Sequence, residues 1–236
     1  VLGIVLLAWA LRRWQLRWGE IGFGGRGALS SSLFGAVLVI IPLAIAYAIE
    51  MAMLNGAGEE PRLGFFVASY SITGNTVMEQ GPVFLLICIL GNLINVVMEE
   101  GVFRGLFLKL GDRGHSLLVS MLLSSLLFGI WHIAAPLRSL LDGDSSLLGA
   151  LLASLVQILL TGLTGFMLAM LARITGSLWA PMAAHFANNF ASNVVHVTSL
   201  GGIDQMQVMR ISIAQSLAFL VVLALSLRHR RREKAR

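Results

Sequence analysis

The chain has 236 residues, 57% of them hydrophobic and 12% charged, with a formal net charge of +5 at pH 7. Soluble domains carry about 25% charged residues, so this composition excludes a soluble globular protein. The basic residues flank apolar runs and do not alternate with aromatic residues, which argues against nucleic-acid binding. The single cysteine, Cys88, lies in an apolar run, so there is no disulfide framework and no cysteine metal cluster.

Seven apolar segments predict an all-α fold, a polytopic transmembrane helical bundle of about seven spans. Most approach the roughly 20 residues that cross a hydrocarbon core, and their continuous apolar character indicates helices and not barrel strands. They cover residues 1–11, 29–54, 83–108, 116–133, 147–171, 177–196 and 208–227. No repeat divides the chain, so we expect one membrane domain, 1–236. Because the chain begins at Val1, we expect N-terminal residues to be missing.

Lys and Arg are divided unevenly between the two sets of loops. If alternate loops share a side, thirteen of them lie on the side of the C-terminal tail and three, Arg62, Arg138 and Arg210, lie opposite. Cytoplasmic loops carry the excess of Lys and Arg, so we expect a cytoplasmic C-terminus in the plasma membrane of a prokaryote. The longest connection, 55–82, either is irregular or holds a short interfacial helix.

The 83–108 segment holds ionisable residues that are costly inside a membrane. Glu100 and Arg104 are four residues apart, so they can pair along one helix. The neighbouring Glu99 points about 100° away from Glu100 and has no local cation, so we expect it to face the bundle interior. A carboxylate in that position suits proton transfer. A structural ion-pair network is an equally good interpretation of this segment alone.

The 116–133 segment ends in Phe128 and His132, four residues apart, with Gly129 allowing close helix approach. A lone histidine at the end of an apolar helix is more often an interfacial or structural residue than a catalytic one. This segment alone therefore leaves the role of His132 open.

The 177–196 segment carries a polar stripe on one helix face. His185, Asn189, Ser192 and His196 follow at helical spacing, with Asn188 beside them. The stripe is compatible with hydrogen bonds between helices or with a shared polar cavity. His196 lies at the outer edge, where we expect it to be interfacial.

Three spans thus carry acid, imidazole or amide groups, and mutual satisfaction in one polar pocket explains them together. The pattern Glu99-Glu100-x-x-x-Arg104, Phe128-x-x-x-His132 and His185-x-x-x-Asn189 resembles the three motifs of the CPBP family. These are the CAAX-processing and bacteriocin-processing intramembrane proteases, also called the Abi or Rce1-like family. All three motifs occur in family order, and the resemblance assigns the catalytic core to about 83–196.

The resemblance implies an intramembrane endopeptidase with a polar cavity inside the bilayer. Glu99 would activate the attacking water, and His132 would position it or relay protons. His185 and Asn189 would stabilise the oxyanion. Glu100, Arg104 and Asn188 would support the site.

The partners implied are the lipid bilayer and a membrane-associated or lipid-proximal peptide substrate. We expect no cofactor, although Glu99, His132 and His185 form a possible zinc set. The alternative function is a non-proteolytic membrane scaffold or bacteriocin-immunity protein that binds a partner within the bilayer. A small transporter is a weaker alternative, because no matching pair of broken half-helices is present.

Overall fold

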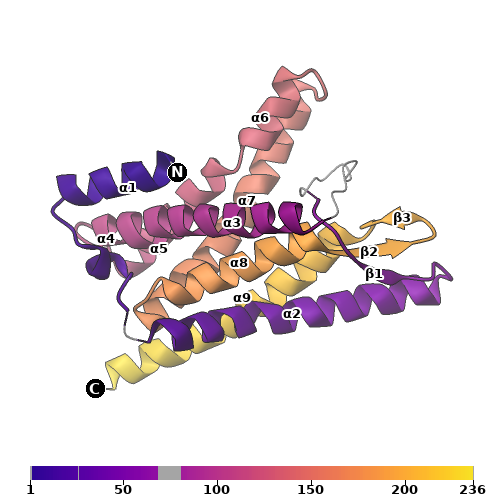
Figure 1. The fold of residues 1–236 in the computed structure, drawn as a ribbon. Helices are drawn as coiled ribbons and strands as arrows, with labels where there is room; N and C mark the ends of the chain where they lie inside the picture. The colour runs from indigo at the N-terminus through magenta and orange to yellow at the C-terminus, as the bar shows by residue number, and fades with distance from the viewer. Residues whose placement is uncertain (1, 26, 69–80, 236) are drawn as a thin grey trace.

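The structure is a computed structural model that describes residues 2–25, 27–68 and 81–235, most of them in long helices (Figure 1). In chain order the elements are α1 (Leu2–Arg13), η1 (Trp18–Ile21), α2 (Ala28–Gly56), β1 (Arg62–Phe65), α3 (Pro82–Glu100), η2 (Gly101–Phe107), α4 (Leu108–Gly111), α5 (Leu117–Trp131), α6 (Ala134–Leu141), α7 (Leu147–Thr175), α8 (Trp179–Val194), β2 (Val195–Ser199), β3 (Gly202–Ile203) and α9 (Gln207–Lys234). Here η1 is a 3-10 helix and η2 is a π-helix. The connection 55–82 falls in part outside the described residues.

The predicted all-α membrane bundle is confirmed, but the count of seven spans is not. In the described ranges, five helical segments are long and apolar enough to cross a membrane, namely Ala28–Gly56, Pro82–Gly111, Leu117–Leu141, Leu147–Thr175 and Gln207–Arg232. The other two expected spans form α1 and α8, with 12 and 16 residues, which is less than the roughly 20 residues of a full span.

The central helix of the bundle is α8, which packs against α2, α3 and α7 (Figure 1). Helix α9 packs against α2 and α7, and α5 packs against α7. A Cβ atom at Gly129 of α5 would lie 2.6 Å from the carbonyl oxygen of Ile158 in α7. The expected close helix approach at Gly129 is therefore confirmed. Gly35 of α2 allows a still closer approach to the Ala180 backbone of α8.

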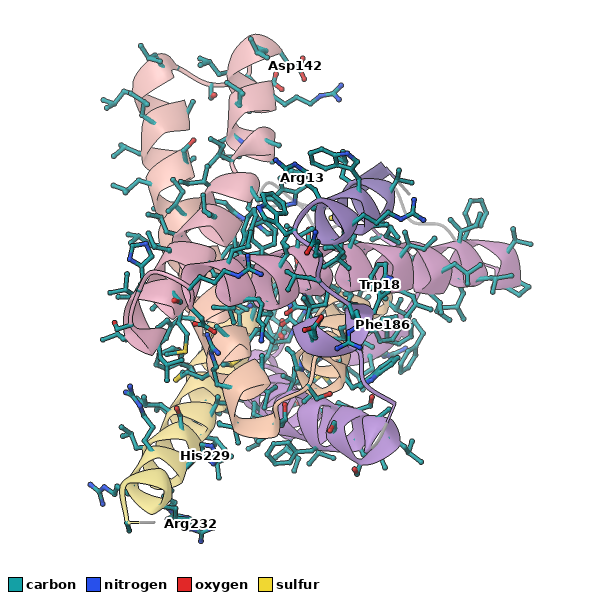
Figure 2. The ribbon with its side chains drawn as sticks, turned by 90° about the vertical axis from the view of Figure 1, so that its left-hand side faces the viewer. Arg13, Trp18, Asp142, Phe186, His229 and Arg232 are labelled. Atoms are coloured by element: carbon teal, nitrogen blue, oxygen red, sulfur yellow. The ribbon has the colours of Figure 1, made fainter. Side chains whose placement is uncertain are left out.

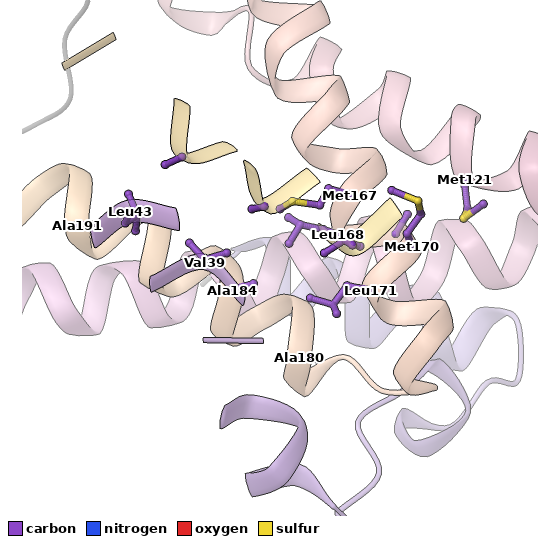
Figure 3. Packing of buried hydrophobic residues seen from close by; sticks show 14 of the residues in the cluster. Val39, Leu43, Met121, Met167, Leu168, Met170, Leu171, Ala180, Ala184 and Ala191 are labelled. Carbon is purple, nitrogen blue, oxygen red and sulfur yellow. The ribbon is translucent and has the colours of Figure 1, made fainter. Parts of the chain in front are cut away.

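The main apolar cluster lies where α7 meets α8 and α2. Figure 3 shows Leu168 and Leu171 of α7 near Ala180 and Ala184 of α8, with Val39 of α2 beside them. Lipid tails are as apolar as leucine, so packing of this cluster stabilises the bundle through van der Waals contact more than through the hydrophobic effect. Alanines on α8 let its backbone pack close to the neighbouring helices, and this packing fixes the position of its polar face within the bundle.

A small antiparallel sheet closes one end of the bundle, in the order β1-β2-β3. Arg62 pairs with Thr198, and Phe65 pairs with Val195. Alternating Val and Thr residues after Val194 favour a strand over a helix, which explains why α8 stops there. The prediction that His196 is an interfacial member of the helical stripe is therefore wrong: it lies in β2 and is fully buried.

The remaining surface is apolar along the helices and charged at their ends. Figure 2 shows His229 and Arg232 near the end of α9 at the bottom of the view, and Asp142 beside the end of α6 at the top. Helix α7 exposes a leucine in every turn of its first half, at Leu147, Leu151, Leu155 and Leu159. An exposed apolar helix face of this length is suited to contact with lipid.

Candidate active site

The two glutamates lie at the junction where α3 becomes a π-helix. Glu99 and Glu100 are the last residues of α3, and η2 begins at Gly101. Such π-helical segments are frequent at functional sites. Arg104 of η2 places its Nη1 atom 3.1 Å from Glu100 Oε1, and both side chains are fully buried. The predicted pair between Glu100 and Arg104 is therefore confirmed.

Arg104 is held by an aromatic ring as well as by Glu100. Its guanidinium carbon lies 3.9 Å from the ring centroid of Phe128, the first residue of the second motif, which is a cation–π contact. Gly165 of α7 leaves room for both side chains, because a Cβ atom there would lie 3.0 Å from Phe128 and 3.2 Å from Arg104 Nη2. The motif phenylalanine thus packs beneath the ion pair of the first motif.

His185 joins α8 to both glutamates. Its Nδ1 atom lies 2.8 Å from Glu100 Oε1, and its Nε2 atom lies 3.7 Å from Glu99 Oε2. The shorter contact is a hydrogen bond. The longer one exceeds hydrogen-bond distance. First and third motifs therefore meet at one imidazole.

Glu99 is held through one oxygen only. The indole Nε1–H of Trp131 donates a hydrogen bond to Glu99 Oε1 at 3.1 Å. Glu99 Oε2 is buried and has no hydrogen-bond partner among the described residues. The prediction that Glu99 faces the interior is confirmed, since the residue is 3% exposed. The sequence analysis missed Trp131, although its position directly before the motif histidine was a usable signal.

His132 caps the C-terminal end of α5 with a defined tautomer. Its Nδ1 atom lies 2.7 Å from the carbonyl oxygen of Phe128. A carbonyl only accepts hydrogen bonds, so Nδ1 carries a proton and Nε2 of the neutral ring is an acceptor. No described residue hydrogen-bonds His132 Nε2, so this acceptor nitrogen is available to position a water molecule.

A cavity of about 230 Å³ gathers most of the predicted site residues. His132, His185, Asn188 and Asn189 line it, so α5 and α8 both contribute. Glu99 does not line this cavity; its carboxylate contacts His185, which does, and Trp131, which does not. The structure thus brings Glu99 next to His185 but separates it from the space that holds His132 and Asn189.

The zinc set considered from the sequence does not assemble in this conformation. Within the described ranges, no group of three or more His, Cys, Asp or Glu side chains has a geometry that could hold a metal ion. Glu99 and His185 are neighbours, whereas the cavity-facing His132 contacts Phe128.

Comparison with known protein families gives a match for the region that contains these residues. Residues 81–191 match the family model described as type II CAAX prenyl endopeptidase Rce1-like, a range that contains all three motifs. This part of the chain is therefore similar to the Rce1-like family. No curated protein and no solved structure gives a significant match. The match over 81–191 and the five long apolar helices support an integral membrane protein and a protease of the CAAX type.

Proposed function

We propose that this chain hydrolyses a peptide bond of a membrane-associated polypeptide with a water molecule activated by Glu99. The observation that carries the proposal is the unpaired Oε2 atom of buried Glu99, 3.7 Å from His185 Nε2, while Trp131 holds Oε1. A carboxylate with one fixed and one free oxygen is well placed to act as a general base.

In the proposed reaction, Glu99 Oε2 takes a proton from water, and the resulting hydroxide attacks the scissile carbonyl carbon. The C–O bond forms, and the oxyanion accepts hydrogen bonds from Asn189 and from His185 when its Nε2 carries a proton. The C–N bond then breaks as Glu99 returns the proton to the leaving amine. The acceptor nitrogen of His132 positions the water from the cavity side.

This mechanism requires a local movement, because Glu99 does not line the cavity in the present conformation. Catalytic hydrogen bonds are often long or poorly aligned before substrate binds. Glu99 Oε2 lies 3.7 Å from Nε2 of His185, which lines the cavity, so a small movement of the Glu99 side chain with Oε1 still bound by Trp131 would bring Oε2 to the cavity. The buried Glu100–Arg104 pair stays fixed and holds His185 in place.

For the substrate we propose a lipid-modified C-terminal peptide, following the prenyl CAAX activity named in the family description. A polypeptide anchored by an apolar chain stays at the depth of a site built between membrane helices. The exposed leucines of α7 give this part of the protein a lipid-compatible surface next to the cavity.

The test is cleavage in reconstituted vesicles. Farnesylated CAAX peptides and their unlipidated counterparts are incubated with the protein, and the released C-terminal fragment is measured by mass spectrometry. We expect wild-type protein to cleave the lipidated peptide and Glu99→Gln to lose about 100-fold to 10,000-fold in kcat, the usual contribution of a general base. The control is Glu20→Gln, which changes an acid in η1, outside the site.

Each outcome decides between the candidate functions. Equal cleavage by wild type and Glu99→Gln overturns the role of Glu99. No cleavage of any peptide by folded protein favours the non-proteolytic scaffold or immunity function. Retention of activity in the presence of a zinc chelator supports the metal-free mechanism, and loss restored by zinc overturns it.

We also propose that the C-terminus lies in the cytoplasm of a prokaryotic cell. The basic tail after residue 227 and the Arg12–Arg13 pair that ends α1 support this orientation. The test is labelling of a single cysteine added after Arg236, in a Cys88→Ser background, by a membrane-impermeant reagent. Labelling only after cell lysis supports the orientation, and labelling of intact spheroplasts contradicts it.

A further inference from the structure

Carboxamide side chains from three helices converge on the catalytic cavity. Besides Asn189, the cavity is lined by Asn188 of α8, Gln157 of α7 and Gln215 of α9. The family motifs include only Asn189 among these residues. Gln157 and Gln215 belong to helices that carry none of the three motifs, so the resemblance assigns them no role.

Most of these amides lack a partner within the part of the chain that the structure describes. No hydrogen bond joins the side-chain amides of Gln157, Asn188 or Asn189 to another described residue. Gln215 Oε1 accepts a hydrogen bond from Thr164 Oγ1 at 3.1 Å, which leaves its NH₂ group free. These four side chains are partly exposed and line the cavity, so their free amide groups are available to hydrogen-bond a polar ligand there.

The chemistry of the lining restricts what that ligand is. No Lys, Arg, Asp or Glu lines this cavity in the described chain, so it is not suited to a phosphate headgroup or a metal ion. Each carboxamide offers one C=O acceptor and one NH₂ donor, which matches the N–H and C=O of a peptide main chain. About 230 Å³ is less than the 300–1,000 Å³ of typical ligand sites, so only a short stretch of main chain fits.

We propose that Gln157 and Gln215 bind the main-chain amides of the substrate beside the scissile bond. The proposal rests on the proposed peptidase function and adds two substrate-binding residues to it. On α7, Gln157 shares a face with Thr161 and Thr164, and both threonines also line the cavity. Thr164 fixes the orientation of the Gln215 amide across the α7–α9 contact. These side chains line the same cavity as His185 and Asn189.

Binding by these residues has a defined kinetic signature. A main-chain hydrogen bond made equally in the ground state and the transition state changes KM and leaves kcat unchanged. Replacing Gln157 or Gln215 by methionine keeps the side-chain length and removes both hydrogen-bonding groups. We therefore expect each of Gln157→Met and Gln215→Met to raise KM about fivefold to tenfold, the effect of one lost hydrogen bond.

The experiment uses the farnesylated CAAX peptide and full-length protein in vesicles. Steady-state cleavage gives kcat and KM for both variants, and fluorescence anisotropy gives Kd for the same peptide on a Glu99→Gln background, where no cleavage is needed. The matched control is Ser216→Ala, the exposed neighbour of Gln215 that does not line the cavity. Thermal unfolding verifies that each variant is folded.

The outcomes separate this inference from the proposed function. A raised KM and Kd for Gln157→Met and Gln215→Met, with values for Ser216→Ala unchanged, support it. Unchanged KM and Kd in folded variants overturn it, even if Glu99→Gln abolishes cleavage. If the chain cleaves nothing but both variants weaken peptide binding, the role of Gln157 and Gln215 in peptide binding is supported and the peptidase function is not. Absence of peptide binding to wild-type protein overturns both.

Discussion

Two buried clusters in this chain contain the same kinds of residues at different places in the bundle. The motif cluster consists of Glu99, Glu100, Arg104 and His185, and the sheet-end cluster consists of Glu50, His196, Asp204 and Arg210. Each has two acids, one arginine and one histidine, and each guanidinium lies over an aromatic ring. Arg104 lies 3.9 Å from the Phe128 centroid, and Arg210 lies 4.4 Å from the Tyr47 centroid.

The clusters differ in how completely their hydrogen bonds are made. In the sheet-end cluster, Arg210 bonds both Glu50 and Asp204, while His196 bonds Asp204 and the Phe66 carbonyl. Only Glu50 Oε1 is unpaired there among the described residues. The motif cluster leaves four buried atoms unpaired within the described chain, namely Glu99 Oε2, Glu100 Oε2, Arg104 Nε and Arg104 Nη2.

This difference supports the proposal that the motif cluster is the reactive one and the sheet-end cluster is structural. Buried polar groups in native proteins are nearly always satisfied, so unpaired atoms call for a physical explanation. The sheet-end cluster joins α2 and α9 to the sheet, and among the described residues it leaves only Glu50 Oε1 without a hydrogen-bond partner. The motif cluster keeps spare hydrogen-bonding capacity beside the cavity, which a water molecule and a substrate can use. Residue types alone therefore do not distinguish a catalytic cluster from a structural one.

The largest effect on stability is expected from breaking the sheet-end cluster. Arg210→Met leaves Glu50 and Asp204 buried without their cation, and such a loss is destabilising by about 3–5 kcal/mol. We expect a correspondingly lower free energy of unfolding, measured by denaturant titration in detergent. The control is Arg138→Met, because the Arg138–Asp142 pair is exposed and contributes little. Equal stability of Arg210→Met and wild type would contradict the structural role.

A smaller effect, on catalysis and not on stability, is expected from Trp131→Phe. It removes the hydrogen bond that fixes Glu99 Oε1, and hydrogen bonds to charged groups contribute about 1.5–3 kcal/mol. We expect kcat to fall by roughly tenfold or more while KM and the unfolding midpoint stay unchanged. Trp179→Phe is the matched control, because its indole donates to the Gly24 carbonyl, away from the acids. A kcat loss shared by both variants would remove Trp131 from the mechanism.

The sequence predicted the Glu100–Arg104 pair because that contact follows local spacing, whereas only the family resemblance linked His185 to it across 85 residues. Glu100 and Arg104 are one helical turn apart, and His185 and Asn189 share a helix face, so periodicity alone places them. The contact between Glu99 and Trp131 is different, because it depends on how α3 packs against α5. No pattern within either segment specifies that register. Family resemblance linked the three segments but did not supply the indole.

The sheet-end cluster was missed for the same reason. Glu50 and Arg210 are 160 residues apart, and each lies near the end of an apolar run, where a single charge is easily taken for an interfacial residue. Arg210 was counted among the loop charges, but the structure buries it. The usable signal was a pair of opposite charges at the same predicted end of two spans. Strand β2 was missed because it begins at Val195, inside the predicted 177–196 helix, and continues through the β-branched residues Val197 and Thr198.

The smallest expected effect concerns pH and again distinguishes the two clusters. Asp204 lies outside the spans, in the turn between β3 and α9. Burial alone would raise the pKa of Asp204, but hydrogen bonds from His196, Arg210 and the Val197 N–H lower it below its usual value. A group with a lowered folded-state pKa adds stability above its unfolded value and loses it as pH falls through the folded value.

We therefore expect the free energy of unfolding of the wild-type protein to decline as pH falls below about 4, the ordinary range of an aspartate. Asp204→Asn should be less stable than wild type at pH 7, and the difference should shrink as the medium is acidified. Unfolding midpoints in detergent from pH 7 to pH 3 measure this, with Asp142→Asn at the exposed Arg138 pair as control. Parallel curves for wild type and Asp204→Asn would mean that Asp204 binds its proton equally in the folded and unfolded states. The sheet-end cluster would then be held together by Glu50 and Arg210 alone.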